Sequence, residues 1–404
     1  MLKLSVEEIS DEASFAALEK EWNAFLVRSS MNAPFLRHEW FRAWWKAFGG
    51  GRKMAVFIVK TESGRWAAAA PLMEEKGVRA GIPCRVLTSM SNDHSCRFDF
   101  LLSNDPRDDA GDAIAAIMEA IARRAPKVDL IELQDILSDS PTVAAFRRLA
   151  AQSGRRVGLR PTLLTPYIPV EGKWPDYFDA VSGHLKRNLR RRKRQLEEQG
   201  EISIERWTGD GLSEGDRLGD RLREGFEVEA MAWKGSAGTA IRENEVWAEF
   251  YRQWAQTAAE RGWLRLYFLR LNDRPIAFYY TLLYDRKLYY LKLGYDPAYA
   301  RYSPGILLHQ EILESLFQEK ATELDFLGPM MEWKREWARG ERAHVWFYYF
   351  QRGFRPRLIH SIKFGLLPYL KRLRRAAERG LKNASTLFPA RNEPEKSSGH
   401  GREI

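Results

Sequence analysis

The most informative segment of the sequence is Gly294-Tyr-Asp-Pro-Ala-Tyr-Ala-Arg-Tyr-Ser-Pro-Gly-Ile-Leu-Leu308, in which a predicted strand is followed by a predicted helix. Aromatic and aliphatic residues dominate the segment before it, so a strand is predicted at Leu288–Leu293. Ser303 suits the N-cap of a helix, and Pro304 suits its first position. Apolar residues then recur every four positions, which predicts a helix with one buried side that runs to about Lys320.

The start of this helix is a candidate site for an anionic group. The first N–H groups of a helix have no partner within it, and the helix dipole favours negative charge there. Gly305 lets the backbone come close to a ligand, Arg301 adds a positive charge, and no acidic residue follows Asp296 in the loop. A pyrophosphate site and an ordinary strand-to-helix turn explain these residues about equally well.

The order of predicted elements repeats in the two halves of the chain. This order predicts an α+β fold of two tandem lobes, each with a mixed, mostly antiparallel sheet flanked by helices. In the first half, helices are expected at 13–27, 38–48, 110–124 and 142–152, and strands at 55–60, 66–72, 85–89, 98–102 and 128–133. In the second half, helices are expected at 185–199, 247–261 and 304–320, and strands at 263–270, 276–284, 288–293, 323–327 and 344–350.

We expect an N-terminal lobe at 1–165, a C-terminal lobe at 166–350 and a basic tail at 351–404, with the crossover between the lobes at 161–166. The loop of the first lobe that corresponds to the quoted stretch contains three acids, Asp105, Asp108 and Asp109. Because these acids would repel a phosphate, only the second lobe is expected to bind an anionic cofactor.

The composition limits the classes of function. The chain has 404 residues, of which 45% are hydrophobic, and its first dozen residues are too charged for a secretory segment. Two cysteines, Cys84 and Cys96, argue against a disulfide framework and fit a cytoplasmic location. The seven histidines show no ligand spacing, so no metal site is expected.

The net charge of +10 is concentrated at the C-terminal end. Residues 351–404 hold 13 Lys or Arg against 4 Asp or Glu, whereas residues 1–350 hold 51 against 50. A nearly neutral body predicts no specific nucleic-acid partner. The tail carries an apolar stripe among basic residues, which predicts peripheral contact with an anionic membrane; packing of the tail on the body is the alternative. The stripe consists of Ile359, Ile362, Leu366, Leu370 and Leu373.

A second basic segment lies at 184–194, with seven Lys or Arg and no acid. We expect Lys186, Arg187, Arg190 and Arg191 to attract a phosphorylated ligand to the cleft. The alternative is a solvated basic helix face.

Three further segments have residues that suit a site. Trp233 and Lys234 begin a polar loop and are candidates for covering a substrate. Asp325 lies on a predicted central strand, where an acid is costly unless it is paired or functional. It is therefore the candidate general base, with Lys334 as an electrostatic partner; a simple ion pair with Lys334 or Arg335 is the alternative.

At these residues the sequence resembles the acetyltransferase family named for the cellulose-biosynthesis proteins CelD and BcsL. The resemblance extends to about residue 350, and the family is similar to tandem GNAT proteins and, more distantly, to FemAB-type aminoacyl ligases. It rests on Pro34-Phe-Leu-Arg-His-Glu-Trp-Phe-Arg-Ala-Trp-Trp45, Lys186-Arg-Asn-Leu-Arg-Arg191, Trp233-Lys-Gly235 with Gly238-Thr-Ala-Ile241, Tyr302-Ser-Pro-Gly-Ile-Leu-Leu308, and Asp325-Phe-Leu-Gly328 with Trp333-Lys-Arg-Glu-Trp337.

The resemblance implies an acyltransferase that moves an acyl group from acetyl-CoA or a longer acyl-CoA to an amine or hydroxyl of a small-molecule or saccharide acceptor, in cell-surface polysaccharide production such as cellulose biosynthesis. It places the cofactor at Arg301, Tyr302, Ser303, Gly305, Ile306 and Leu307. The loop departs from the usual GNAT pattern, because it has one glycine and a proline that donates no N–H. An aminoacyl-tRNA-dependent ligase and a non-catalytic assembly protein of a polysaccharide machine remain the alternatives.

Overall fold

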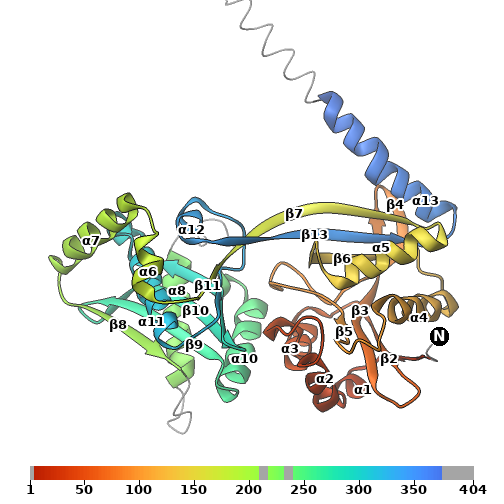
Figure 1. Ribbon diagram of the computed structural model, residues 1–404, viewed down its shortest axis with the longest axis horizontal. Coiled ribbons are helices and arrows are strands. Elements are labelled where there is room, and N and C mark those ends of the chain that lie inside the picture. Colours follow the sequence, from red (N-terminus) through yellow and green to blue (C-terminus); the bar gives the residue numbers. More distant parts are fainter. Residues whose placement is uncertain (1–3, 209–216, 232–239, 375–404) are drawn as a thin grey trace, which may run out of the picture.

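One sheet runs through the part of the chain that the computed structural model describes, residues 4–208, 217–231 and 240–374 (Figure 1). Its strands follow the order β1-β2-β3-β4-β6-β13-β7-β12-β11-β10-β9-β8, and β5 pairs with β3 off this path. The strands are β1 (Ser5–Ile9), β2 (Lys53–Lys60), β3 (Trp66–Arg79), β4 (Ile82–Ser89), β5 (Leu101–Leu102), β6 (Leu130–Leu137), β7 (Arg156–Pro169), β8 (Ile202–Trp207), β9 (Leu264–Leu271), β10 (Arg274–Tyr284), β11 (Lys287–Tyr295), β12 (Glu323–Asp325) and β13 (Gly340–Phe350).

Helices flank this sheet in both halves of the chain. The α-helices are α1 (Glu12–Ala16), α2 (Glu19–Leu26), α3 (His38–Phe48), α4 (Ala110–Arg123), α5 (Pro141–Ser153), α6 (Trp174–Asp179), α7 (Gly183–Glu197), α8 (Arg217–Met231), α10 (Glu245–Glu260), α11 (Pro304–Gln318), α12 (Glu332–Trp337) and α13 (Phe354–His360). Short 3-10 turns are η1 (Pro34–Leu36), η2 (Ile241–Glu243) and η3 (Pro297–Tyr302), and η4 (Ser361–Leu366) is a π-helical segment.

The repeat predicted from the order of elements is present in the fold. In the first half, β2, β3 and β4 form an antiparallel meander, and β6 returns through α4 to lie parallel to β4. In the second half, β9, β10 and β11 form the same meander, and β12 returns through α11 to lie parallel to β11. The tight turn between β10 and β11 is built by Asp285 and Arg286, whose φ angles of 48° and 59° suit a two-residue hairpin. The fold is thus two GNAT-like lobes with mixed, mostly antiparallel strands.

Two long strands join the lobes, and they differ from the sequence-based expectation. The predicted crossover at 161–166 lies inside β7, which pairs with β13 along most of its length and with β12 at its end. Before Tyr167, β7 pairs with a strand on one side only, while on the other side the N–H groups of Phe326 and Met330 donate to its carbonyls; prolines are tolerated where the strand itself donates no ladder bond. The last strand, β13, pairs with β6 of the first half although it lies in the segment 166–350. Figure 1 shows both strands crossing between the lobes.

One predicted strand is much shorter than expected. Of residues 98–102, only Leu101 and Leu102 are in a strand. The side chain of Asp99 accepts hydrogen bonds from the backbone N–H of Phe100 at 2.8 Å and from the hydroxyl of Ser140 at 2.6 Å. These bonds replace the pairing that a strand would need.

The largest hydrophobic core is shared by both lobes. Trp40 on α3 packs against Phe250 and Trp254 on α10, with ring centroids 5.1 Å and 4.9 Å apart. A second core lies on the other face of the second-half strands, under α7 and α11. The two faces of the second-half sheet are therefore covered by different partners, α8, α10 and the first lobe on one side and α7 and α11 on the other.

Candidate active site

The second-half sheet opens between β11 and β12. The two parallel strands pair only from Lys287 with Glu323 to Tyr289 with Asp325. Strand β11 continues for six residues beyond that point, to Tyr295, while β12 ends. Beyond Tyr289, β11 therefore has no ladder pairing with β12 in the described structure, and Phe326, the residue after β12, packs on Tyr290 with ring centroids 5.7 Å apart.

A β-bulge lies at this opening and decides which side chains face it. Tyr280 on β10 is opposite Lys292, but Thr281 is opposite Tyr290, so Leu291 is an extra residue on β11. Tyr280 faces α10, because its hydroxyl donates to the backbone carbonyl of Tyr251 at 3.2 Å. The bulge consequently turns Lys292 to the same side, and its Nζ lies 4.9 Å from the ring centroid of Tyr251.

Side chains from four separate segments meet around Lys292. We call this set the interface cluster: Lys292 on β11, Glu229 on α8, Tyr251 on α10, and His94 and Cys96 on the loop after β4. His94 Nδ1 lies 3.2 Å from the hydroxyl of Tyr251, and its ring stacks on Phe48 with centroids 5.4 Å apart. The cluster therefore lies where the two lobes meet.

Burial sets the protonation states in the interface cluster. It lowers the pKa of His94 to about 4, with a smaller contribution from the charge of Lys292, and it raises the pKa of Cys96 to about 11. Burial also lowers the pKa of Lys292, while the negative charge of Glu229 opposes that shift. At neutral pH the imidazole of His94 and the thiol of Cys96 are therefore uncharged.

The position of Glu229 is fixed by the backbone around it. A Cβ atom at Gly294 would lie only 2.4 Å from Cα of Glu229, so a side chain at Gly294 would push α8 off the sheet. The carboxylate of Glu229 is fully buried and accepts a hydrogen bond from the N–H of Ile241 at 3.1 Å. Glu229 is therefore buried more deeply than Lys292, which is half-buried.

The start of α11, where an anion site is predicted, has the expected residues at its first positions but fewer free N–H groups than a regular helix start. Ser303 and Pro304 are the N-cap and first residue as predicted, but Ser303 has a φ of 52° and makes no capping bond with its side chain. The N–H groups of Ile306 and Leu307 both donate to the carbonyl of Ser303, at 3.0 Å and 3.1 Å. Among the described residues, the N–H of Gly305 in this first turn has no recorded partner, and a Cβ at Gly305 would meet nothing closer than 3.8 Å.

The other predicted cofactor residues divide into an exposed group and a buried group. Arg301 is exposed, with its guanidinium carbon 4.6 Å from the ring centroid of Tyr302. The side chains of Tyr302 and Leu307 are buried in the core under α11, so they can contribute only backbone atoms to a ligand. Asp296 does not oppose an anion, because Arg274 pairs with it at 2.6 Å.

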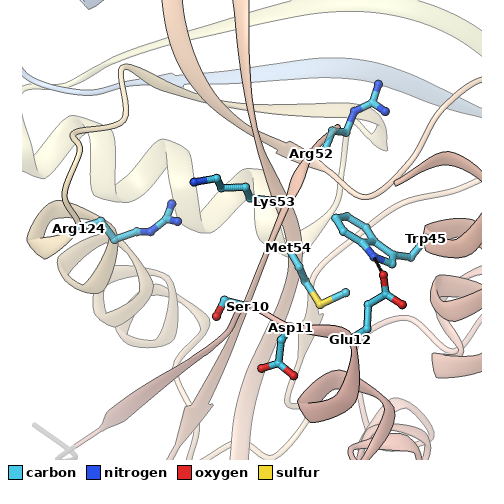
Figure 2. A pocket seen from close by; sticks show the side chains of 8 residues that line it. All are labelled: Ser10, Asp11, Glu12, Trp45, Arg52, Lys53, Met54 and Arg124. Carbon is cyan, nitrogen blue, oxygen red and sulfur yellow. Dashed lines mark hydrogen bonds between the residues drawn. The ribbon is translucent and has the colours of Figure 1, made fainter. Parts of the chain in front are cut away.

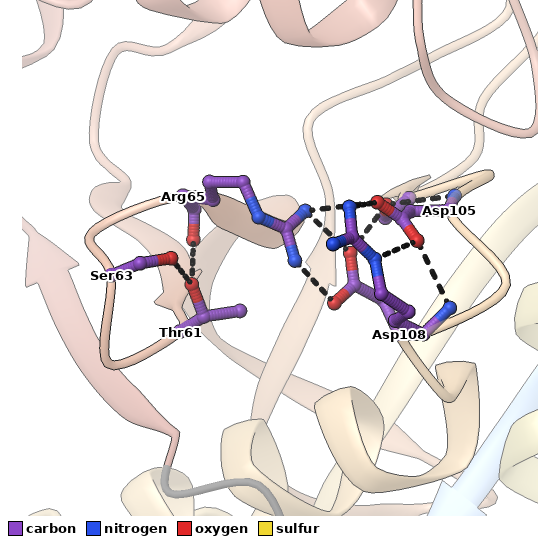
Figure 3. A network of polar contacts seen from close by, with 7 residues as sticks. Thr61, Ser63, Arg65, Asp105 and Asp108 are labelled. Carbon is purple, nitrogen blue, oxygen red and sulfur yellow. Dashed lines mark hydrogen bonds and ion pairs between the residues drawn. The ribbon is translucent and has the colours of Figure 1, made fainter.

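The corresponding loop of the first lobe is neutralised by its own arginines (Figure 3). Arg65 binds Asp108 through two nitrogens at 3.0 Å and 3.1 Å and reaches Asp105 at 3.5 Å. Arg107 also pairs with Asp105, and Asp109 caps α4 by accepting from the N–H of Asp112 at 3.0 Å. The acids of this loop are thus engaged by arginines and by the cap of α4, and the binding of an anionic ligand by the second lobe stays a prediction.

The predicted basic helix is α7, and it lies beside the start of α11. It contacts η3, the turn that leads into α11, and Lys193 pairs with Glu311 on α11 at 3.1 Å. Arg187, Arg190 and Arg191 are exposed and have no acidic partner within the described residues. Lys186 differs from them, because it is half-buried and pairs with Asp179 at 3.5 Å.

Asp325 has different partners from those expected. Its fully buried carboxylate pairs with Arg97 from the first lobe and with Arg342 from β13, the latter at 3.1 Å, and it accepts from the N–H of Leu327 at 2.9 Å. Arg342 also binds Glu323 at 2.7 Å. Both carboxylate oxygens are thus occupied by donors, and this geometry favours an ion pair that joins the lobes over proton transfer.

Lys334 is buried on α12, and its Nζ donates to the carbonyl of Pro329 at 3.2 Å. The same nitrogen lies 5.8 Å and 5.9 Å from the ring centroids of Phe326 and Trp333. The remaining substrate candidates, Trp233 and Lys234, lie outside the described residues.

A separate hollow of about 360 Å³ lies in the first lobe (Figure 2). Two of its arginines bind neighbouring protein atoms: Arg124 pairs with Glu8 at 3.1 Å and Glu74 at 3.0 Å, and Arg52 donates to the carbonyl of Phe48 at 2.8 Å. It carries no functional assignment. The lining residues are Ser10, Asp11, Glu12, Trp45, Arg52, Lys53, Met54 and Arg124. Among the described residues there is also no group of His, Cys, Asp and Glu suited to a metal ion.

Sequence reasoning missed the interface cluster. Lys292 had a visible signal, because it interrupts an otherwise apolar strand. Glu229 had none, because α8 contains several acids and only packing shows which of them is buried.

Comparisons with known proteins agree with this fold. The family described as an acetyltransferase (GNAT) domain matches residues 183–335, which include α7, the bulged strand β11 and α11. The chain has the GNAT fold. FemX is similar in structure, with a TM-score of 0.58 at 12% identity over 88% of this chain and 99% of that protein. A conserved Bacteroides thetaiotaomicron protein of unknown function has a TM-score of 0.54 at 12% identity, over 85% and 100%.

A tandem GNAT protein from the clavulanic acid biosynthesis pathway is also similar, with a TM-score of 0.49 at 13% identity over 87% of this chain and 100% of that protein. No match was found in a comparison with curated proteins.

Proposed function

We propose that this protein transfers an acyl group from an acyl thioester to an amine or hydroxyl, at the opening between β11 and β12. The observation that carries the proposal is Lys292, a half-buried cation that a bulge turns toward the Tyr251 ring, where the two lobes meet. Bulges at such positions re-aim side chains next to active sites. The GNAT domain match over residues 183–335 supports the reaction class.

The donor is acetyl-CoA or a longer acyl-CoA, with its pyrophosphate at the start of α11. Gly305, the exposed Arg301 and the neighbouring α7 arginines supply an N–H group and positive charge there. Tyr295 links this place to Lys292: it lies 3.9 Å from the Cβ position at Gly305 and three residues, or about 10 Å, along β11 from Lys292. The donor supplies the activated carbonyl carbon.

The residues of the interface cluster perform the chemistry as follows. The acceptor nitrogen or oxygen attacks the carbonyl carbon, the C–S bond breaks, and the acceptor's proton ends on the released thiol. The ammonium of Lys292 stabilises the negative charge that develops on the carbonyl oxygen. Glu229 keeps Lys292 protonated in its buried place, and the neutral His94 and Tyr251 exclude water from the first-lobe side.

The resemblance to the CelD and BcsL family points to a saccharide acceptor in cell-surface polysaccharide synthesis. Its FemAB-type relatives favour a second donor, aminoacyl-tRNA, for which the exposed arginines of α7 supply a basic surface. Transfer of radiolabel from acetyl-CoA and from charged tRNA to a panel of amines and sugars separates the two donors. We expect label from acetyl-CoA; label from charged tRNA alone would replace the donor, and no transfer from either would support a non-catalytic assembly protein.

A further inference from the structure

The chain leaves the first lobe through a helix that projects away from the body (Figure 1). This helix comprises α13, the π-helical segment η4 and the helical residues 367–374. Its first part packs on the sheet: Ile359 is fully buried, and Phe364 lies 5.4 Å from the ring of Tyr348. Gly158 on β7 is required there, because a Cβ would lie 2.2 Å from the Phe364 ring. The body therefore anchors the helix only up to about residue 364.

The second part of the helix exposes large apolar side chains. Leu370 and Leu373 are 48% and 49% exposed, although large apolar side chains are mostly buried elsewhere in the protein. The stripe predicted from the sequence is thus divided, with Ile359 inside the body and its last three leucines outside. The exposed apolar residues of this segment are Leu366, Leu367, Tyr369, Leu370 and Leu373. We call this set the apolar face of the C-terminal helix.

Basic residues flank the apolar face, and the next acid in the sequence, Glu378, lies four residues beyond Arg374. No Asp or Glu occurs between Glu341 and Glu378. Lys371, Arg372 and Arg374 lie on the same turns as the exposed leucines. An exposed apolar strip with only positive charges beside it matches an anionic, partly apolar surface in both properties.

We infer that the apolar face docks on an anionic lipid bilayer, as a peripheral anchor of the first lobe. The positive charge of the basic residues favours a lipid bilayer over a second copy of the chain. Two copies of the face would bring like charges together, whereas anionic lipid headgroups neutralise these charges. The leucines would lie at the boundary between headgroups and acyl chains, with the helix in the plane of the membrane. Within the described residues no helix has the length and apolarity to cross a bilayer.

Vesicle flotation of the full-length protein tests this inference. The probe is vesicles of phosphatidylcholine with one third phosphatidylglycerol, and pure phosphatidylcholine is the comparison. We expect binding to the anionic vesicles, a loss of at least tenfold in the partition coefficient when Lys371, Arg372 and Arg374 are replaced by Gln, and a similar loss for L366S/L370S/L373S. The matched control is R187Q/R190Q/R191Q, which removes three positive charges from α7 and should leave vesicle binding unchanged.

Each other outcome counts against the inference. Equal flotation of the wild type and both tail variants would overturn it, as would an equal loss in the α7 control, which would show a general charge effect. Light scattering covers the remaining case: a wild-type dimer that becomes monomeric in the leucine variant would assign the face to a second copy of the chain. Because the leucines are exposed, circular dichroism should show that all variants fold.

Discussion

Replacing Lys292 with Met tests the chemistry of the interface cluster. Met keeps the length of the side chain and its packing against the Tyr251 ring, but it removes the ammonium that we place next to the developing oxyanion. Loss of one oxyanion-stabilising donor typically costs a factor of about 10²–10³ in kcat, or about 3–4 kcal/mol of transition-state free energy. We therefore expect kcat to fall by about 10²–10³ with a smaller change in KM.

The assay is steady-state release of free thiol from acetyl-CoA in the presence of an active acceptor. Lys287→Met is the matched control, because Lys287 is on the same strand at the turn end, five residues before Lys292, and is also half-buried. Its kcat should match the wild type within about threefold. A folded Lys292→Met protein with wild-type kcat would refute the reasoning, because no other cation of the interface cluster replaces Lys292.

The pH dependence of kcat gives a second test with a definite sign. The ammonium is the active form of Lys292, and burial lowers its pKa, so kcat should fall as pH rises toward a value below the ordinary 10.5. Glu229 opposes this shift, so Glu229→Gln should move the alkaline limb to still lower pH. Gln can still accept the hydrogen bond from Ile241. An alkaline limb that does not move would show that Glu229 acts only in packing.

Three further variants test the other assignments. The triple variant R187Q/R190Q/R191Q should have a higher KM for the donor at low salt but not at high salt, because added ions screen the attraction between these arginines and an anionic donor. If the KM at low salt is unchanged, α7 is a solvated basic helix face. Asp325→Asn should lower the free energy of unfolding by about 3–5 kcal/mol in urea titrations, since it removes the carboxylate partner of the buried Arg97 and leaves Arg342 with Glu323 alone, while the folded fraction keeps its kcat; a stable variant with lost kcat would restore Asp325 as the base. Burial lowers the pKa of His309 to about 3, so between pH 6.5 and 3 only the unfolded chain protonates this side chain, and the free energy of unfolding decreases by up to about 1.4 kcal/mol for each unit by which the pH is lowered. The decrease in the free energy of unfolding from pH 7 to pH 5 should be smaller for His309→Gln than for the wild type; an equal decrease would contradict this assignment.

Local sequence signals were sufficient for most of the second-half fold. The Ser303-Pro304 start of α11, the Asp285-Arg286 turn and the four-residue apolar period are determined by neighbouring residues, and all three are present. The exchange of β13 into the first-half sheet was not predictable in this way. It depends on pairing between residues about 200 positions apart, such as His344 with Leu137, which no local pattern encodes.

The candidate site shows the same division. The loop before α11 is contiguous in sequence and was found, whereas the interface cluster is assembled from four distant segments. Asp325 was correctly recognised as a costly buried acid, but its partners are Arg97, which is 228 residues away in the sequence, and Arg342, which is 17 residues away. Nearby Lys334 instead binds a backbone carbonyl. Distance in the sequence was therefore a poor guide to which charges pair.

Calorimetric titration with CoA tests directly whether an acyl-CoA binds at the start of α11. Gly305→Asp puts a negative charge at the start of α11, where a Cβ has space and the fold should be kept. The control is Asp108→Ala in the first lobe, whose carboxylate is bound by Arg65. We predict binding heat for the wild type and for Asp108→Ala, and none for Gly305→Asp. Equal heats for all three proteins, or no heat from folded wild type, would contradict an acyl-CoA site at this helix.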